Sequence, residues 1–253
     1  MKQIYKRPES LKDAVFRFCP GCGHSILHKL IAQCIDEFGI REKTIGIAPV
    51  GCAVFAYDYF NFDVIECAHG RPPAVATALK RVMPDRFVFS YQGDGDLASI
   101  GMAEIIHAAN RGENLSVIFV NNANYGMTGG QMAPTTLTGM KTSTTPRGRR
   151  PEREGYPLQV SEILSQIEGV SFIARTALDG IKGVKETKAM IKKAFRYQLE
   201  NKGFSFVEVL SPCPTDWGIS PKDSFQWVKS SMEPVFKTGT LKDRYAGENN
   251  GKH

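Results

Sequence analysis

No stretch of this 253-residue sequence is apolar for long enough to cross a membrane, which takes about 20 residues as a helix. The first residues, Met-Lys-Gln-Ile-Tyr-Lys-Arg-Pro, lead into Glu and Lys and lack the apolar core of a secretion signal. Internal repeats and low-complexity segments are also absent. These absences argue against a membrane protein, a secreted protein and a repeat array. They predict a soluble, cytoplasmic protein without a membrane partner.

Cysteine is scarce, with six residues in the chain. Because no secretion signal is present, we do not expect structural disulfides, and the cysteines are predicted to bind metal or to be buried. The net charge of +6 is mostly dispersed along the chain, and its densest patch, 141–153, is predicted to be a loop. We therefore expect no nucleic-acid partner.

Short apolar runs alternate with amphipathic segments along the chain. Continuous apolar runs are typical of strands buried on both faces, so the pattern predicts an α/β fold with a parallel sheet covered by helices on both faces. The length suits one large α/β domain or two small ones. The predicted helices are 24–38, 74–82, 98–111, 159–168 and 184–201, and the predicted strands are 44–48, 87–91, 115–120, 172–174 and 204–210.

Chemically distinctive residues follow four of the predicted strands. In a parallel sheet, all these strands end at the same edge, and ligands bind beyond that edge. The sequence therefore predicts that residues far apart in the chain converge there. They are Cys52, Asp94, Asn122 and Cys213.

Two of these strands end in residues that suit a divalent cation bound to a diphosphate. Such a cation takes oxygen ligands in near-octahedral geometry. Asp94 supplies a carboxylate, the Asn122 side chain a carbonyl oxygen, and the backbone of Asn124 a third oxygen. Gly93 and Gly95 allow a tight turn whose backbone N–H groups can face phosphate. Gly-Asp-Gly alone is typical of an ordinary turn. A strand before it, a helix after it and a second strand that ends in Asn121-Asn122 together favour a magnesium-diphosphate site.

Four of the cysteines form a second candidate site. Cys19 and Cys22 are separated by two residues, and Cys52 and Cys213 each follow a strand. Four thiolates suit either zinc or an iron–sulfur cluster, although zinc sites are usually built from two close pairs. The other two cysteines are predicted to be buried without a ligand role; they are Cys34 and Cys67.

Three motifs together resemble one protein family. The motifs are His69-Gly70-Arg71, Gly93-Asp94-Gly95-Asp96 and Asn121-Asn-Ala-Asn-Tyr-Gly-Met-Thr-Gly-Gly-Gln131. They are similar to those of the β subunit of 2-oxoacid:ferredoxin oxidoreductases of the 2-oxoglutarate/2-oxoisovalerate type. The likeness extends from Cys19 to about Cys213. It implies oxidative decarboxylation of a 2-oxoacid to an acyl-coenzyme A, with electrons passing to ferredoxin.

The resemblance also implies the cofactors and their ligands. Residues 1–213 would form one thiamine-diphosphate and iron–sulfur domain, and 214–253 a tail that packs on this domain or on a partner. Coenzyme A would be the co-substrate, and His69 is the catalytic candidate. The implied Mg²⁺ ligands are Asp94, Asn122 and Asn124, and the implied [4Fe–4S] ligands are Cys19, Cys22, Cys52 and Cys213. The implied cofactor contacts are Ala68, Gly70, Gly93, Gly95, Asp96, Gly126, Met127 and Thr128.

The resemblance further implies a hetero-oligomer. In the family, an α subunit supplies the glutamate that contacts the aminopyrimidine ring. Glu104 is no convincing substitute, because it belongs to the helix after the metal motif. We therefore expect the chain alone to be inactive. A ferredoxin-like small subunit is a further partner that the family allows, and ferredoxin is the expected electron acceptor.

Two features leave the substrate and one contact surface open. Several relatives have a lysine at the position of Gly129, where it can pair with a substrate carboxylate. Its absence weakens the case for 2-oxoglutarate without excluding it, because Lys141 or a partner residue can supply the charge. The expected substrate is therefore either 2-oxoglutarate or a branched-chain acid such as 2-oxoisovalerate. The basic stretch 141–153 contains Pro146 and Pro151 and is predicted to be a loop. It is either solvated or a dock for ferredoxin or the phosphates of coenzyme A.

Two other functional classes compete with this interpretation. A non-redox thiamine-dependent decarboxylase or lyase subunit explains Asp94 and Asn122 but leaves four cysteines without a role. A zinc-stabilised binding module explains the cysteines and the basic charge but not the Gly-Asp-Gly and Asn-Asn motifs. Iron with sulfide, no transition metal, or zinc in the purified protein distinguishes the three.

Overall fold

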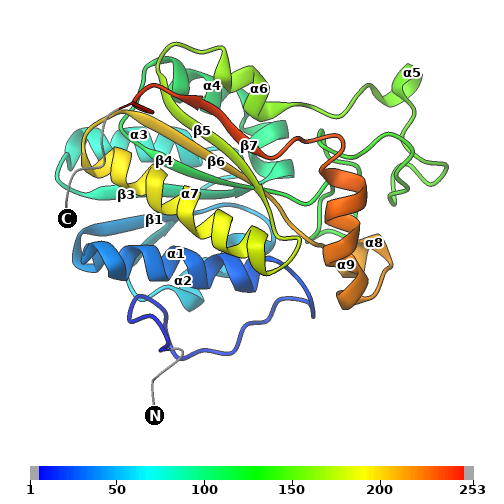
Figure 1. Ribbon diagram of the computed structural model, residues 1–253, viewed down its shortest axis with the longest axis horizontal. Coiled ribbons are helices and arrows are strands. Elements are labelled where there is room, and N and C mark those ends of the chain that lie inside the picture. The colour runs from blue at the N-terminus through cyan, green and yellow to red at the C-terminus, as the bar shows by residue number, and fades with distance from the viewer. Residues whose placement is uncertain (1–5, 248–253) are drawn as a thin grey trace.

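The computed structural model describes residues 6–247, which build a seven-stranded sheet with helices on both faces (Figure 1). The strand order is β2-β1-β3-β4-β6-β5-β7, and every neighbouring pair is parallel except β5 with β7. The predicted α/β fold with a mainly parallel sheet is confirmed. The strands are β1 (Thr44–Ala48), β2 (Asp63–Glu66), β3 (Phe87–Gly93), β4 (Ser116–Asn121), β5 (Val170–Ala177), β6 (Phe204–Leu210) and β7 (Gly239–Asp243).

Two apolar cores lie on opposite faces of the sheet. Helices α1 and α7 lie side by side on one face, and α3, α4 and α6 cover the other (Figure 1). Because successive strand residues point to opposite faces, Phe89 and Tyr91 of β3 join the first core and Val88 joins the second. These helices are α1 (His24–Phe38), α3 (Pro72–Val82), α4 (Met102–Asn110), α6 (Val160–Ser165) and α7 (Ile181–Leu199).

The edge strands β2 and β7 are not predicted by the sequence pattern. Both carry charged residues and are partly exposed, so neither shows the apolar run of a buried strand. β7 belongs to the segment after residue 213, and it runs antiparallel to β5. Short helices are also missed, because each has only one or two turns; they are α2 (Ala56–Tyr59), α5 (Pro151–Glu154), α8 (Pro214–Trp217) and α9 (Pro221–Trp227).

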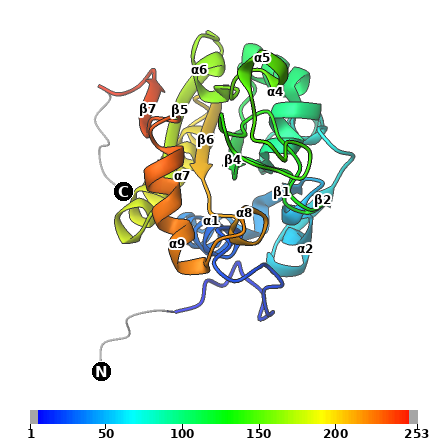
Figure 2. The same ribbon diagram turned by 90° about the vertical axis from the view of Figure 1, so that its right-hand side faces the viewer.

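The strand order brings the candidate residues to one end of the molecule. Strands β1, β3, β4 and β6 are consecutive neighbours in the sheet. The chain passes from β1 to β2 on one side of β1 and then returns to β3 on its other side. Open α/β sheets bind ligands where the strand order reverses in this way. Figure 2 looks toward this end, where α8, α9 and the long segment between β4 and α6 surround the strand ends. Among residues 6–247, no helix combines the length and apolar character that a membrane span needs.

A buried ion-pair cluster holds the end of β4 in place. Arg175 of β5 is 1% exposed, and its Nε donates to Glu208 of β6 at 2.8 Å. Its terminal nitrogens donate to Glu162 of α6 at 2.8 and 2.6 Å. The second oxygen of Glu208 accepts from Asn121 Nδ2 at 2.8 Å. The cluster therefore fixes the residue that precedes Asn122.

Replacing Arg175 with methionine should lower the free energy of unfolding by about 3–5 kcal/mol, because the charge of Glu208 stays buried without its partner. Urea denaturation followed by circular dichroism measures the change. Lys182→Met on α7 is the control, since Lys182 is exposed and pairs with Glu186 only at 3.6 Å. Equal stability losses in the two variants would contradict the role given to the buried cluster.

Candidate active site

The loops after β1, β3 and β4 enclose a cavity of about 130 Å³. Most of the residues predicted to contact the cofactor or Mg²⁺ line it. Ala68 and Gly70 do not line it, but they flank His69, which does. The wall consists of His24, 49–53, His69, 93–96, Asn122 and 124–128.

Asp94 is the buried acid of this cavity, with 2% of its surface exposed. Its Oδ1 accepts from the Gly95 N–H at 3.0 Å, and its Oδ2 accepts from Thr135 Oγ1 at 2.8 Å and from the Asn122 N–H at 3.2 Å. Burial raises the pKa of Asp94 to about 7, although these hydrogen bonds oppose the rise. A cation in the cavity would favour the ionised form.

The Asn122 side-chain amide lies beside three oxygen atoms. Without a cation its nitrogen points toward them and donates to the Asn124 backbone oxygen at 2.8 Å, to Asn124 Oδ1 at 3.1 Å and to Asp94 Oδ1 at 3.2 Å. With a cation among these oxygens, the amide can turn and present its own oxygen as a further ligand. Carboxylate, amide and backbone oxygens are the ligands that Mg²⁺ takes. The three predicted ligands therefore fit a divalent cation.

The turn that carries these oxygens is held in a strained conformation. Ala123 has a φ of 60°, a left-handed value that is uncommon for a residue with a side chain. Thr136 Oγ1 donates to the Ala123 carbonyl at 2.6 Å, and Trp217 Nε1 donates to the Asn122 carbonyl at 3.0 Å. Nothing in the sequence pattern points to these supporting residues, because they come from distant segments.

Asp96 organises the turn that carries His69. Its Oδ1 lies 2.5 Å from His69 Nδ1 and accepts from the Gly70 N–H at 2.7 Å, and its Oδ2 accepts from Gln92 Nε2 at 2.6 Å. Gly70 has a φ of 79°, and a Cβ there would lie 2.7 Å from the backbone of Gly101. Both carboxylate oxygens of Asp96 are thus engaged within the protein. Asp96 acts on the cavity by placing His69.

The helix predicted over 98–111 is divided where it meets the cavity. A π-helical turn occupies Gly95–Ile100, and α4 begins only at Met102. Such turns are frequent at functional sites. A Cβ on Gly95 would lie 2.3 Å from the ring of Tyr125, whose hydroxyl donates to the Gly95 carbonyl at 3.2 Å. Only glycine fits at position 95.

The four cysteines predicted as ligands line a second cavity, of about 120 Å³. Cys34 and Cys67 do not line it; Cys34 is fully buried, with its Sγ 3.8 Å from the Lys188 carbonyl. The two cavities share a wall. A Cβ on Gly126 would lie 3.4 Å from Cys52 Sγ and 3.6 Å from Asn122 Nδ2, so the sulfur site and the oxygen site adjoin there. The lining cysteines are Cys19, Cys22, Cys52 and Cys213.

Three of these thiols are held protonated at neutral pH. Burial raises the pKa of Cys22 to about 12 and that of Cys52 to about 11. Burial also raises the pKa of Cys213, whose Sγ donates to Asp216 Oδ2 at 3.3 Å. Metal binding to such thiols displaces their protons.

The arrangement of the four cysteines can be compared with that of a single-zinc site. Within residues 6–247, no three His, Cys, Asp or Glu side chains converge closely enough to hold a single metal ion. Four sulfurs on one zinc lie only about 4 Å apart, given Zn–S bonds of about 2.3 Å. The four cysteines line one cavity but do not converge in this way.

The basic loop 141–153 is anchored by one buried residue. Arg149 is 4% exposed, and its guanidinium donates to six backbone carbonyl groups of the surrounding loop. Arg147, Arg150 and Arg153 are exposed and line a separate cavity of about 320 Å³. The loop is therefore ordered around Arg149, and its role as a dock for a partner or for coenzyme A stays a prediction.

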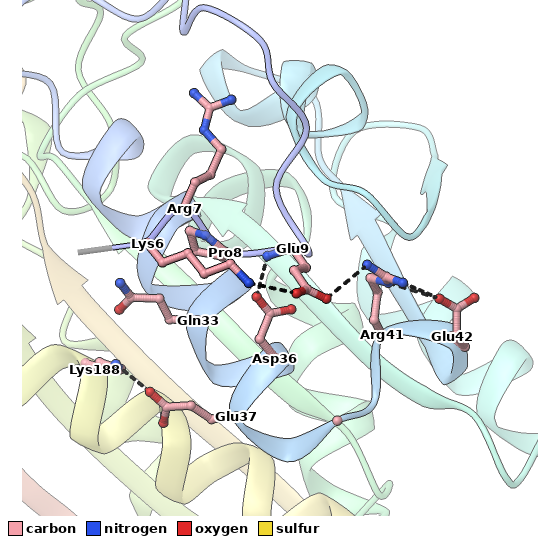
Figure 3. A pocket seen from close by; sticks show the side chains of 11 residues that line it. Lys6, Arg7, Pro8, Glu9, Gln33, Asp36, Glu37, Arg41, Glu42 and Lys188 are labelled. Carbon is pink, nitrogen blue, oxygen red and sulfur yellow. Dashed lines mark hydrogen bonds and ion pairs between the residues drawn. The ribbon is translucent and has the colours of Figure 1, made fainter. Parts of the chain in front are cut away.

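A larger cavity, of about 530 Å³, lies between the N-terminal segment and α1, away from the candidate site (Figure 3). Most of the charged side chains around it are already paired with one another. It contains no nucleophile and no buried acid without a partner, so we assign it no chemistry. The pairs are Lys6 with Glu9 at 3.1 Å, Arg41 with Glu42 at 2.9 Å and Lys188 with Glu37 at 2.6 Å.

The amino-acid sequence matches a family model and several known proteins. Residues 49–209 match the model of the C-terminal TPP-binding domain of thiamine pyrophosphate enzymes. The 2-oxoglutarate synthase subunit KorB of Methanocaldococcus jannaschii is 38% identical over 93% of this chain and 84% of that protein. A 2-oxoacid:ferredoxin oxidoreductase subunit beta from Sulfolobus is 31% identical over 89% of this chain and 69% of that protein. The chain belongs to the β-subunit family of 2-oxoacid:ferredoxin oxidoreductases.

Two further proteins are similar to this β-subunit chain, one in sequence over part of its length and one in its solved structure. The ketoisovalerate oxidoreductase subunit VorA of Methanothermobacter thermautotrophicus is 49% identical over 97% of this chain, but the chain spans only 54% of VorA. The solved 2-oxoglutarate:ferredoxin oxidoreductase from Magnetococcus marinus, with 2-oxoglutarate, coenzyme A and succinyl-CoA bound, matches with a TM-score of 0.75 and 24% identity. That match covers 95% of this chain and 86% of the other, and it confirms the predicted thiamine-diphosphate-binding fold.

Proposed function

We propose that this β-type chain carries the thiamine diphosphate and the [4Fe–4S] cluster of an enzyme that oxidatively decarboxylates a 2-oxoacid to an acyl-coenzyme A. The electrons would pass through the cluster to ferredoxin. One observation supports this most directly: the oxygen-lined and sulfur-lined cavities share a wall formed by His24, Cys52, Asn122, Gly126 and Met127. A non-redox thiamine enzyme has no use for four cysteines around the adjoining cavity.

Each cavity contributes its own part of the reaction. Asp94, Asn122 and Asn124 would hold Mg²⁺ and with it the diphosphate, which fixes the cofactor against the shared wall. When bound, thiamine diphosphate supplies the electron sink for decarboxylation. His69 is held by Asp96 and lines the same cavity. Its ring can donate a hydrogen bond to the substrate or accept one from it.

Among residues 6–247, the only acids that line the oxygen-lined cavity are Asp94 and Asp96, and both are already engaged. Glu104, on α4, is already ion-paired with Arg71. In this family the required glutamate comes from the α subunit, and we propose that an α subunit completes the site here. Coenzyme A would reach the site in that complex.

A branched-chain 2-oxoacid fits the substrate side better than 2-oxoglutarate. Gly129 has a φ of 100° and lies in open space, so a lysine at this position would need a strained backbone. Lys141 lines a different cavity, together with Trp217 and Trp227, and so does not replace the missing charge. The similarity to the ketoisovalerate oxidoreductase subunit supports the same choice. We propose 2-oxoisovalerate or a close analogue.

The test is turnover of the complete enzyme, purified without oxygen after co-expression with its partner subunits. We expect coenzyme A-dependent reduction of ferredoxin with kcat/KM at least about tenfold higher for 2-oxoisovalerate than for 2-oxoglutarate, because an extra carboxylate would lie unpaired. The isolated chain supplied with cofactors should show no turnover. Carbon dioxide release without ferredoxin reduction would favour the non-redox lyase, and zinc without iron or sulfide would favour the binding module.

A further inference from the structure

A buried histidine–tyrosine pair lies beside the cysteine cavity and has no part in the mechanism above. His24 is the first residue of α1, is 5% exposed and lines both cavities. Its Nδ1 lies 2.6 Å from the hydroxyl of Tyr91 on β3, which is 1% exposed. The pair thus links the core of the sheet to the wall that the two cavities share.

The pair has one proton more than its own hydrogen bond uses. A neutral imidazole carries one N–H and the phenol carries one O–H. If Tyr91 donates to Nδ1, the Nε2–H of His24 remains available; if Nδ1 donates to Tyr91, the O–H remains available. Neither group has another hydrogen-bond partner among residues 6–247. Tyr91 lines neither cavity, so the donor that can reach a group in the cysteine cavity is the Nε2–H of His24, which is free when Tyr91 donates to Nδ1.

The pair lies close to the sulfur atoms. Burial raises the pKa of Cys22, and a hydrogen bond from the His24 backbone N–H opposes this rise. The His24 side chain lines the cysteine cavity together with Cys22 and Cys52, whereas Tyr91 lines neither cavity. His24 is therefore the member of the pair that can reach the sulfur atoms of a cluster in that cavity, and Tyr91 acts through it.

The neighbouring His28 is a buried histidine away from both cavities, although its Nε2 also has no partner within residues 6–247. Its Nδ1 donates to the His24 carbonyl at 2.7 Å, and its ring stacks on Phe60 with centroids 4.8 Å apart. His28 lines neither cavity. It supports His24 from the core side, whereas His24 faces the cavities.

We propose that the His24–Tyr91 pair donates a hydrogen bond to a sulfur atom of the cluster and thereby raises its reduction potential. A donor stabilises the more negative, reduced cluster more than the oxidised one, and hydrogen bonds to sulfur are a known determinant of cluster potential. This proposal rests on the proposed function, because it requires a cluster on the four cysteines. Its effect would be to help the cluster accept electrons from the adjoining cavity.

The experiment uses the complete enzyme, purified without oxygen, in three variants. Tyr91→Phe and His24→Leu each remove one member of the pair. Tyr59→Phe is the matched control, since Tyr59 is 1% exposed in the same core but its hydroxyl accepts from the Arg17 N–H at 2.9 Å. Iron and sulfide are measured first, and the midpoint potential is then measured by reductive titration followed by electron paramagnetic resonance.

We expect both test variants to keep their iron and sulfide and to show a lower midpoint potential than the wild type and Tyr59→Phe. Unchanged potentials in variants with full iron and sulfide would overturn the proposal. Loss of the cluster from both test variants but not from Tyr59→Phe would also overturn it, because the pair would then only support the structure. If the wild-type protein contained no iron and sulfide, the proposed function itself would be wrong. This outcome is distinct from a cluster whose potential does not depend on the His24–Tyr91 pair.

Discussion

Replacing Asp94 with asparagine should abolish Mg²⁺-dependent binding of thiamine diphosphate and leave the iron and sulfide content unchanged. The amide has nearly the same shape but carries no charge, so it cannot balance a divalent cation among Asn122 and Asn124. Loss of a residue that only supports a metal ligand already costs about 10–100-fold in affinity, and loss of the charged ligand should exceed that. Titration calorimetry with thiamine diphosphate and Mg²⁺ on the complete enzyme measures the effect.

The pH dependence of the same binding follows from the buried position of Asp94. Its pKa is raised from 3.8 to about 7 by burial, so the cation must displace a proton below pH 7. The affinity for Mg²⁺ should therefore fall about tenfold for each pH unit below 7. Asp94→Asn should remove this dependence along with the binding itself. Retained, pH-independent binding in the variant would show that Asp94 is not a ligand.

The cofactor-free chain should respond in the opposite direction. Because the pKa of Asp94 is higher in the folded than in the unfolded chain, the folded state holds the proton more tightly. Stability is therefore lost as the pH rises from about 4 to above 7, by at most about 4 kcal/mol for a shift of this size. At pH 8, Asp94→Asn should recover about 1–2 kcal/mol of the lost free energy of unfolding, because asparagine carries no buried charge. The recovery is only partial, since one amide oxygen replaces two carboxylate oxygens as hydrogen-bond acceptors.

Replacing Cys213 with serine should remove most of the iron and sulfide and abolish electron transfer to ferredoxin. A serine hydroxyl is a poor ligand for iron compared with a thiolate. Cys213 lines the cavity together with the other predicted ligands. Iron, sulfide and the visible spectrum of protein purified without oxygen measure the loss. Thiamine diphosphate binding should persist, because Asp94 and Asn122 are untouched.

Cys34→Ser is the matched control for this prediction. Cys34 is also a buried thiol, but it packs against α7, with its Sγ near the Lys188 carbonyl. Its replacement should cost stability and leave the iron content close to that of the wild type. Equal losses of iron in Cys213→Ser and Cys34→Ser would mean that the cysteines are wrongly assigned.

The elements predicted well from sequence are those with the strongest apolar pattern. The helix over 24–38 and the strands over 44–48 and 204–210 coincide with α1, β1 and β6. Their apolar residues face cores that the pattern alone reveals. The edge strands and the π-helical turn at Gly95–Ile100 were beyond such a pattern, because their conformation depends on the neighbours they pair with or pack against.

The sequence by itself determined the fold class and the family, and it predicted which residues form the candidate site. Apolar periodicity reports burial, and the residues after the strands must share one edge of a parallel sheet. The residues that support the site depended on the tertiary structure. Thr135 on Asp94, Trp217 on Asn122 and the His24–Tyr91 pair are contacts between distant segments. Such contacts leave no periodic signal, because their spacing in the chain is set only by how the loops and helices pack across the strand ends.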